Sequence, residues 1–310
     1  MHESNQSKMT DIWYTIFNPA SGSGNHKKRI DSIKRLLTNS HLKYNFISTK
    51  YAHHEELLVQ KAIKKGYRKF ICIGGDGTLH YMVNGVMKQD LVHTNKITIA
   101  VIPSGTGNDW IKTYGISSNP TKAIQTIVNN KCKHQDIGRI SLATPKNVVF
   151  FANTAGIGFD AYVVKNINKY EKWGSLSYII AAVVGLKYFK PSTLIVQTSD
   201  KIYDAELFLL SVGLCKYSGS GMQLTHFKNH QTGFFDITYI SKIKRRTVLK
   251  NILKLYFGGI HTLKESQCFI EKNIDIEKNT SSFIQADGEL IGSGNLHIQL
   301  IPNAIQFIVS

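Results

Sequence analysis

The sequence predicts an α/β domain with a parallel sheet over residues 1–130 and an all-β antiparallel sandwich over residues 131–310. The first part alternates short apolar strands, glycine-rich turns and helical patterns, and such alternation builds a parallel sheet covered on both faces. The second part consists mainly of short strand-like segments separated by Gly, Asn or Asp turns, which is typical of a sandwich. A chain of 310 residues favours two domains, and residues near 300–310 are a candidate for completing the first one.

One local plan occurs three times in the first part. Apolar strands are predicted at residues 12–17, 70–73 and 97–102, and the turns NPASGSGN, GGDGT and PSGTGND follow them. A further strand at 45–49 and a helix at 55–65 lie between the first two units. Because the carboxyl ends of parallel strands meet at one edge of a sheet, where ligands bind, the three turns predict a phosphate site. Glycine allows close backbone approach, and helix N-termini direct N–H groups toward anions.

The second part contains seven strand-like segments and two helical interruptions. The helices are predicted at residues 175–189, with Ser175 as N-cap, and at 247–256. The strands are predicted at residues 147–153, 193–198, 205–213, 234–241, 266–270, 273–276 and 296–301. No low-complexity linker separates the two parts, so we expect them to pack around a cleft.

The charge balance predicts an anionic partner. The chain has 38 Lys and Arg against 21 Asp and Glu, a formal net charge of +17. No recognition helix or RNP-type aromatic motif accompanies the basic groups, so nucleic acid is not expected. Adsorption to an anionic membrane fits better, at about 1 kcal/mol per basic residue near the surface.

The apolar segments predict a cytoplasmic protein, and the basic charge predicts peripheral contact with the inner face of the membrane. The N-terminus has no run of signal-peptide length, and the longest apolar stretch, residues 178–186, is shorter than the about 20 helical residues that span a bilayer. The four cysteines, Cys72, Cys132, Cys215 and Cys268, form no CxxC pair and are interpreted as buried, reduced thiols. Residues 53–56 (HHEE) are interpreted as the solvated first turn of a helix.

Three sets of residues resemble the nucleotide-binding loops of the diacylglycerol kinase catalytic family, which includes bacterial diacylglycerol kinases and sphingosine kinases. They are residues 18–22 (NPASG), 74–78 (GGDGT) and 103–109 (PSGTGND). The resemblance continues through residues 136–139, 153–160 and 285–289, so it covers nearly the whole chain in order. The P-loop, the dinucleotide fingerprint and the HRD and DFG motifs of protein kinases are missing from the sequence. The resemblance implies a 6-phosphofructokinase-like first domain, a β-sandwich second domain and an active site between them.

The resemblance also implies roles for individual residues. Glu289 would accept the proton of the lipid hydroxyl, and Asp76 and Asp109 would be the acidic members of the site. A carboxylate beside a triphosphate needs a cation between them, so Asp76 is the candidate for holding Mg²⁺ with ATP. The residues expected to contact ATP are Asn18, Pro19, Ala20, Ser21, Gly22, Thr49, Gly75, Asp76, Gly77, Thr78, Leu79, His80, Tyr81 and Thr106.

The chain departs from the family pattern at several positions. His80 and Tyr81 replace a common Asn-Glu pair, Lys112 stands where Arg is common, and Ser23 replaces a basic residue for which Lys27 or Lys28 could substitute. The bacterial family also has a structural Mg²⁺ site, and the matching residues here are Asn229, Thr232 and Phe234. Thr232 replaces the charged ligand, so we expect that second metal to be weak or absent.

These observations favour an ATP-dependent lipid kinase acting on diacylglycerol or a related glycerolipid. Two alternatives stay open: an NAD kinase, supported by GGDG, and a non-catalytic nucleotide or lipid sensor. Access for the lipid is predicted near residues 155–162 and the helix at 175–189. The choice of lipid leaves no spacing signature, and a homodimer is left open.

Overall fold

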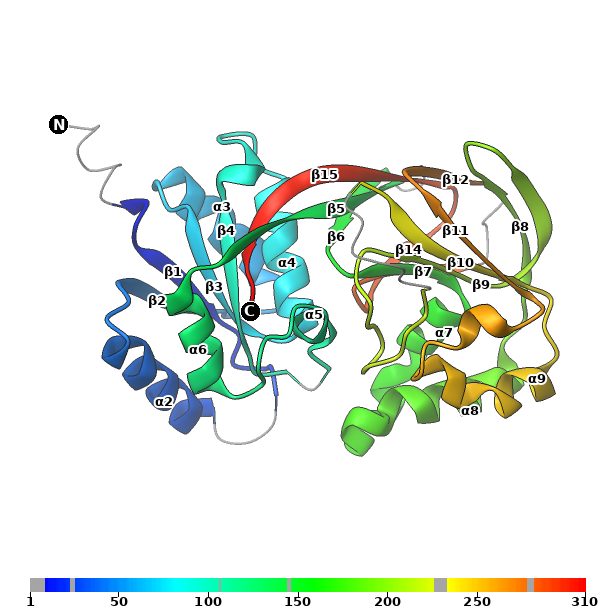
Figure 1. Cartoon of the computed structure of the whole chain (residues 1–310), viewed down its shortest axis with the longest axis horizontal. Coiled ribbons are helices and arrows are strands. Elements are labelled where there is room, and N and C mark those ends of the chain that lie inside the picture. The colour runs from blue at the N-terminus through cyan, green and yellow to red at the C-terminus, as the bar shows by residue number, and fades with distance from the viewer. Residues whose placement is uncertain (1–8, 23–25, 106, 144–145, 226–232, 278–281) are drawn as a thin grey trace. The chain divides into compact units, whose positions relative to one another are not determined.

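The computed structural model describes residues 9–22, 26–105, 107–143, 146–225, 233–277 and 282–310 (Figure 1). The chain divides into two compact units, Met1–Gln135 with Asn303–Ser310, and Asp136–Pro302. Two strands, β5 (Cys132–Leu142) and β15 (Leu296–Ile308), therefore each contribute residues to both units.

A parallel sheet forms the centre of the first unit. Its strands run in the order β15, β4, β3, β1, β2, and every pairing between them is parallel. The bounds are β1 (Trp13–Phe17), β2 (Tyr44–Ser48), β3 (Lys69–Gly74) and β4 (Thr98–Pro103). Strands β3 and β4 are buried along almost their whole length, as expected for a sheet covered on both faces.

Alternate residues of a strand point to opposite faces of the sheet, so the apolar strands present apolar side chains on both faces. Helices pack against these side chains. Ile71 and Ile73 of β3 pack in one core cluster with Ile33 of α2 and Ile124 of α6. Helices α3 and α4 pack against each other, and α4 also packs against β3. The bounds are α2 (His26–Asn39), α3 (His54–Lys64), α4 (Asp76–Met87), the 3₁₀ turn η1 (Thr94–Lys96), α5 (Asp109–Thr113) and α6 (Pro120–Asn129).

The second unit is built from antiparallel strands around one apolar core, as the sequence predicts. Strands follow one another in the order β14, β13, β7, β9, β8, β12, β15, while β10 joins β9 to β11 and β5 joins β15 to β6. The core cluster draws side chains from the strands of this unit. The bounds are β6 (Asn147–Phe151), β7 (Thr154–Gly158), β8 (Ser192–Gln197), β9 (Ile202–Gly213), β10 (Phe235–Ser241), β11 (Ser266–Glu271), β12 (Asn273–Glu277), β13 (Phe283–Ala286) and β14 (Glu289–Ser293).

Helices of the second unit gather on one side of its strands (Figure 1). A second core cluster joins α7 and α8 to residues of β9 and β10. The bounds are α7 (Phe159–Asn166), η2 (Ile167–Leu176), α8 (Ser177–Tyr188), α9 (Arg245–Lys250), η3 (Ile252–Leu255) and η4 (Ile260–Thr262). None of the helices in the described part of the chain has the length and apolar composition to cross a bilayer.

Both helices predicted for the second unit differ in detail from the structure. The first begins at Ser177, with Leu176 as N-cap, so the assignment of Ser175 as N-cap is wrong. The second is interrupted at Asn251, whose φ of −110° and ψ of 10° leave the helical region. The Asn251 side chain donates to the Thr247 carbonyl at 2.8 Å, and a 3₁₀ turn follows. Side-chain bonding of this kind competes with regular helix, which explains the break.

The cysteines also differ in part from the prediction. Cys72 and Cys215 are buried, but Cys132 on β5 and Cys268 on β11 are exposed, so the interpretation of all four as buried is wrong for these two.

Candidate functional site

Three loops follow neighbouring strands of the first unit, and their backbones lie against one another. Loop 1 is residues 18–22 after β1, loop 2 is residues 74–76 at the end of β3, and loop 3 is residues 103–105 and 107–108 at the end of β4. The Ser21 and Ser104 hydroxyl oxygens are 2.7 Å apart, and the Ser104 N–H donates to the Gly74 carbonyl at 2.8 Å. The three glycine-rich turns that the sequence singles out therefore form one surface.

Glycine is required where loops 2 and 3 meet. A Cβ added to Gly105 would lie 2.6 Å from the Gly75 Cα, closer than real Cβ atoms approach other atoms. Loop 1 approaches just as tightly, because a Cβ on Gly22 would lie 2.0 Å from the Ser104 carbonyl oxygen, and Gly22 has a φ of +72°. The surface is built of backbone, which suits it to a ligand rich in hydrogen-bond acceptors, such as a phosphate chain.

Arg29 supports loop 1 from α2. Its Nη2 donates to the Ser21 carbonyl oxygen at 2.6 Å. Lys27 and Lys28, which could substitute for the basic residue of the family pattern, are both exposed, whereas Arg29 contacts loop 1. Helical spacing could have identified it, because Arg29 shares a face with the buried Ile33 and Leu37. Ser23, the other position in question, lies outside the described residues.

The Asn18 side chain ties loop 1 to two helices. Its Nδ2 donates to Glu55 Oε1 at 3.1 Å and to Thr78 Oγ1 at 3.0 Å, and its Oδ1 accepts from the Ala20 N–H at 2.9 Å. Asn18 therefore sets the shape of the loop. Glu55 is only 2% exposed and His54 is buried as well, so the interpretation of residues 53–56 as a solvated turn is wrong. An interior amide partner holds Glu55 inside, which sequence spacing does not reveal.

Asp76, the candidate for holding the cation, also caps α5. Its Oδ2 accepts from the Asp109 N–H at 2.9 Å and its Oδ1 from the Trp110 N–H at 3.2 Å. A carboxylate at a helix N-terminus stabilises the helix, so Asp76 links loop 2 to the end of loop 3. A carboxylate has about four acceptor positions, so capping and cation binding are compatible. The buried Asp109 forms an ion pair with Lys112 at 2.8 Å, which gives that departure from the family pattern a local role.

The interior beneath the loops is acidic. Cys72 lies on β3, completely buried, and burial raises the pKa of its thiol well above the usual range. The negative charges of Glu55 and Asp76 raise that pKa further. Glu55 and Asp76 thus place two carboxylates near Cys72, and carboxylate oxygens are ligands that Mg²⁺ accepts. Among the described residues no group of three His, Cys, Asp or Glu could hold a metal ion.

The remaining predicted contacts to ATP differ in accessibility. Leu79 and His80 of α4 are buried, and His80 Nε2 lies 3.3 Å from the Asn84 amide nitrogen. Tyr81 is half-buried and its ring stacks on the His53 ring, with centroids 4.1 Å apart. Thr49 is nearly buried, and its N–H donates to the Phe17 carbonyl at 2.9 Å. Thr106 lies outside the described residues, as do Asn229 and Thr232 of the second metal site.

Glu289 opens strand β14 directly after a tight turn. Asp287 and Gly288 have φ angles of 51° and 86°, and Ala286 pairs with Glu289, so the turn is a two-residue hairpin of the Asp-Gly type. Glu289 itself is half-buried. The Asp-Gly pair therefore forms the hairpin turn that is typical of it, and the role of Glu289 as proton acceptor remains a prediction.

The Asp287 carboxylate anchors this hairpin. It accepts N–H groups from Ala152 at 3.0 Å, Asn153 at 2.8 Å and Thr154 at 3.1 Å, and the Asp287 N–H donates to the Thr154 carbonyl at 2.8 Å. Charge-assisted bonds of this kind are about twice as strong as neutral ones. The hairpin is thus held at the segment between β6 and β7, and Glu289 is held with it.

A buried chain of hydrogen bonds runs from the hairpin to α7 and α8. Gln285 accepts from the Gly288 N–H at 2.8 Å and donates to Asp160 Oδ2 at 2.6 Å, and the Tyr178 hydroxyl donates to Asp160 Oδ1. Burial raises the pKa of the Asp160 carboxyl above its usual range, while the bonds from Tyr178 and Gln285 lower it. Sequence analysis noted Asp160 and Gln285 without finding that they touch.

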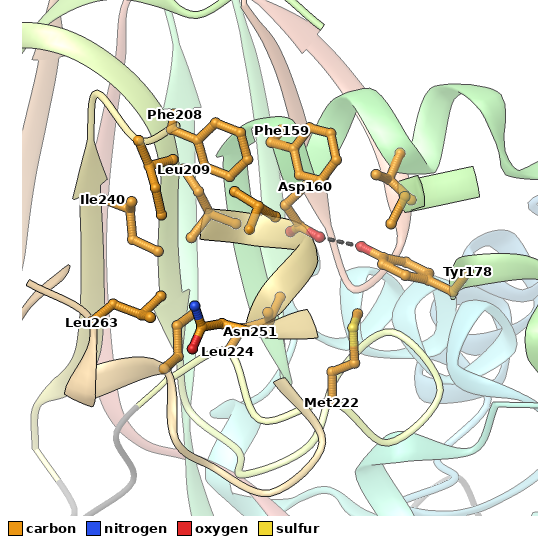
Figure 2. A pocket seen from close by; sticks show the side chains of 15 residues that line it. Phe159, Asp160, Tyr178, Phe208, Leu209, Met222, Leu224, Ile240, Asn251 and Leu263 are labelled. Atoms are coloured by element: carbon orange, nitrogen blue, oxygen red, sulfur yellow. Dashed lines mark hydrogen bonds between the residues drawn. The ribbon is translucent and has the colours of Figure 1, made fainter. Parts of the chain in front are cut away.

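Asp160 and Tyr178 also stand at the wall of an apolar pocket in the second unit, shown in Figure 2. The space open to the centre of a water-sized sphere is about 50 Å³, several times what one water needs. Its wall includes Phe159, Phe208, Met222, Leu224, Ile240 and Ile260. The prediction of lipid access near residues 155–162 and the following helix coincides with this pocket in position, and lipid binding there remains a prediction.

Known proteins resemble the chain over almost its full length. Residues 13–140 match the family model described as "Diacylglycerol kinase catalytic domain" and residues 153–309 match "YegS C-terminal NAD kinase beta sandwich-like domain". A Bacillus subtilis (strain 168) protein named diacylglycerol kinase is 25% identical over 282 residues, covering 89% of each chain. A diacylglycerol kinase of Mycobacterium tuberculosis (strain ATCC 25618 / H37Rv) is 27% identical over 301 residues, covering 94% of this chain and 93% of that protein.

A solved structure agrees in fold. The crystal structure of a diacylglycerol kinase from Bacillus anthracis str. Sterne superposes with a TM-score of 0.74 at 21% identity, covering 98% of both chains. At that identity the superposition supports the architecture alone, and the two family matches carry the classification. The loops 1 to 3, the hairpin with Glu289 and the two matched domains lead to one conclusion: the chain belongs to the diacylglycerol kinase catalytic-domain family, in the form that continues into a YegS-type C-terminal β-sandwich.

Proposed function

We propose that the protein is a lipid kinase that transfers the γ-phosphate of ATP to a hydroxyl of a membrane lipid, namely diacylglycerol or a related glycerolipid. The family membership and the names of the relatives support this class of reaction. The observation that carries the proposal is the tight convergence of loops 1, 2 and 3 on one backbone surface.

The first unit would bind the nucleotide. Backbone N–H groups at the start of α4 face the phosphates, because a helix N-terminus favours anions. Asp76 would hold Mg²⁺ together with the phosphates, and the cation when bound neutralises charge that develops on the transferred group. Asn18, Arg29 and the Asp76 cap contribute by fixing the loops, since phosphoryl transfer depends mainly on positioning and electrostatics.

The second unit would supply the acceptor side of the reaction. Glu289 would accept the proton of the lipid hydroxyl while the oxygen attacks the γ-phosphorus and ADP leaves. The Asp287 anchor would keep this carboxylate in place. The apolar pocket beside Asp160 would take hydrocarbon of the lipid. This mechanism requires the γ-phosphate and the lipid hydroxyl to meet, and that meeting is part of the proposal.

The test is transfer of γ-labelled phosphate from ATP to a panel of lipid alcohols, with Glu289→Gln and the matched variant Glu277→Gln. Glu277 is an exposed glutamate at the end of β12. Removing a general base costs about 10²- to 10⁴-fold in kcat, so Glu289→Gln is expected to fall by that factor while Glu277→Gln transfers at the rate of the unmodified chain. Equal rates in the two variants would remove Glu289 from the mechanism.

Two further arms address the alternatives. NAD enters the panel as an acceptor, and labelling of NAD in place of lipid would identify an NAD kinase. Binding of ATP and lipid without transfer at any Mg²⁺ concentration would identify a sensor.

A further inference from the structure

Helix α8 presents an apolar face to solvent as well as to the core. Its inner positions, among them Tyr178, Ala182 and Leu186, are buried. Its outer positions, spaced three and four residues apart, are Ile180, Val183, Val184, Lys187 and Tyr188, and Tyr188 is 61% exposed. A surface helix of a globular protein normally carries polar residues on its outer face. Of these five outer positions only Lys187 is charged. The outer face of α8 is therefore apolar enough to bind a partner.

The elements beside α8 extend the apolar surface. Trp173 and Leu176 of η2 are each about half exposed, and η2 runs directly into α8. Helix α9, which packs against α8, begins a stretch in which Leu253 is 68% and Phe257 81% exposed. Clustered exposed apolar side chains mark interaction sites. We call this the α8 face: Trp173, Leu176, Ile180, Val183, Val184, Tyr188, Leu249, Leu253 and Phe257.

Basic side chains surround the α8 face. Residues 242–264 contain seven Lys or Arg and no Asp or Glu, and Lys172, Lys187 and Lys190 add three more beside η2 and α8. Apolar residues flanked by cations, with Trp and Tyr among them, match the chemistry of the headgroup region of an anionic bilayer. A second copy of the chain would bring two cationic faces together, which disfavours a dimer through this surface.

The apolar pocket lies on the inner side of the same elements. Tyr178 and Ala182 of α8, Val248 of α9, and Asn251 and Ile260 after it all line the pocket. The elements that form the α8 face are therefore also part of the pocket wall. We propose that the α8 face docks the protein on an anionic lipid bilayer, so that the pocket takes lipid directly from the membrane. Docking on the bilayer stands without the proposed function. Only the statement that the pocket takes lipid rests on the protein being a lipid kinase.

Flotation with vesicles tests the docking without nucleotide or acceptor. The vesicles are phosphatidylcholine alone, or phosphatidylcholine with 30% phosphatidylglycerol. Val184→Glu is compared with Ile202→Glu, an equally apolar residue of β9 that is 66% exposed and lies outside the α8 face. We expect Val184→Glu to lower partitioning onto the anionic vesicles by about tenfold or more, and Ile202→Glu to leave it within twofold. Equal partitioning of the two variants would overturn the proposal.

Two charge-reversal variants test the contribution of the basic residues beside the α8 face. The two substitutions are Arg246→Glu, beside the α8 face, and Lys201→Glu, in the turn before β9. The side chains of Arg246 and Lys201 are both exposed. Each lost basic residue near an anionic surface costs about fivefold in partitioning, so Arg246→Glu is expected to fall by at least that factor and Lys201→Glu to change little. Partitioning that is unaffected by Arg246→Glu, or equal on the neutral vesicles, would contradict an anionic bilayer as the partner.

Tryptophan fluorescence places the contact on the molecule. Trp13 and Trp110 are buried, whereas Trp173 on the α8 face is 52% exposed. Vesicle binding is expected to shift the emission to the blue and to allow quenching by lipids with brominated acyl chains, and Trp173→Phe is expected to abolish both changes. Sedimentation of each variant tests the competing occupant: a dimer that Val184→Glu dissociates without changing vesicle binding would assign the face to a second copy. Docking without phosphate transfer would refute the proposed function alone, and transfer to lipid by a chain that never docks through this face would refute the docking alone.

Discussion

Replacing Asp287 by Asn is expected to loosen the hairpin that carries Glu289. The carboxylate accepts three backbone N–H groups, from Ala152, Asn153 and Thr154. An Asn side chain keeps one oxygen, and its NH₂ group would meet the N–H that the lost oxygen accepted. One bond is lost outright and the others lose their charge assistance, so the free energy of unfolding is expected to fall by about 2 kcal/mol for this half-buried group.

The assay is thermal unfolding followed by steady-state kinetics. A loss of about 2 kcal/mol corresponds to about 5 °C in Tm for a domain of this size. The matched control is Asp204→Asn, an exposed aspartate on β9, which is expected to change Tm by less than about 1 °C because it lies on the surface. In the lipid kinase assay, Asp287→Asn is expected to lower kcat more than it raises KM, because it misplaces a group that acts in the transition state. Tm values that agree for Asp287→Asn and Asp204→Asn would refute the anchoring role.

Three further substitutions test loop packing, a buried carboxyl group and the Asp76 cap. Gly105→Ala places a Cβ 2.6 Å from the Gly75 Cα, so loops 2 and 3 must separate, and kcat/KM for ATP is expected to fall on the order of 100-fold. The control is Gly259→Ala, whose Cβ would have the Lys254 side chain as its nearest neighbour, at 3.2 Å. Equal kcat/KM values for the two variants would contradict the close approach of loops 2 and 3. Burial raises the pKa of Asp236 to about 6, above its unfolded value of about 4, so its contribution to stability is full below pH 4 and is lost as pH rises through 6. The Asn side chain of Asp236→Asn cannot ionise. Between pH 5 and 8 the gain in its free energy of unfolding over the unmodified chain is therefore expected to grow to about 1 kcal/mol, after allowance for solvent screening. Urea unfolding at several pH values measures this difference, and a difference that does not change with pH would contradict the raised pKa. Asp76→Asn keeps one acceptor for the N–H groups that open α5 but loses its charge, so the Mg²⁺ concentration for half-maximal transfer is expected to rise about tenfold, and an unchanged Mg²⁺ titration would remove Asp76 as the cation ligand.

The fold class could be predicted from the spacing of apolar residues along the sequence. Apolar residues become buried, and buried positions recur with the period of the helix or strand that contains them. The strand predicted at 12–17 is β1 (Trp13–Phe17), the helix at 55–65 is α3 (His54–Lys64), and the strand at 273–276 is β12 (Asn273–Glu277). Errors occurred where a side chain competes with the backbone, as at Asn251, or where a helix begins without a side-chain cap, as at Ser177. The local sequence pattern does not reveal such contacts between side chains and backbone.

The order of glycine-rich motifs likewise determined the family from sequence, and the turn at residues 287–288 was recognisable from Asp-Gly alone. Tertiary structure decided which side chains hold the loops: Arg29 on loop 1, Glu55 on Asn18, Asp76 on α5 and Asp287 on the segment after β6. These partners are 8 to 135 residues apart along the chain. The sequence shows which residues can form hydrogen bonds and which are apolar enough to be buried. Only the folded backbone brings distant donors and acceptors into hydrogen-bond distance, and that proximity gives Asp76 and Asp287 their structural roles.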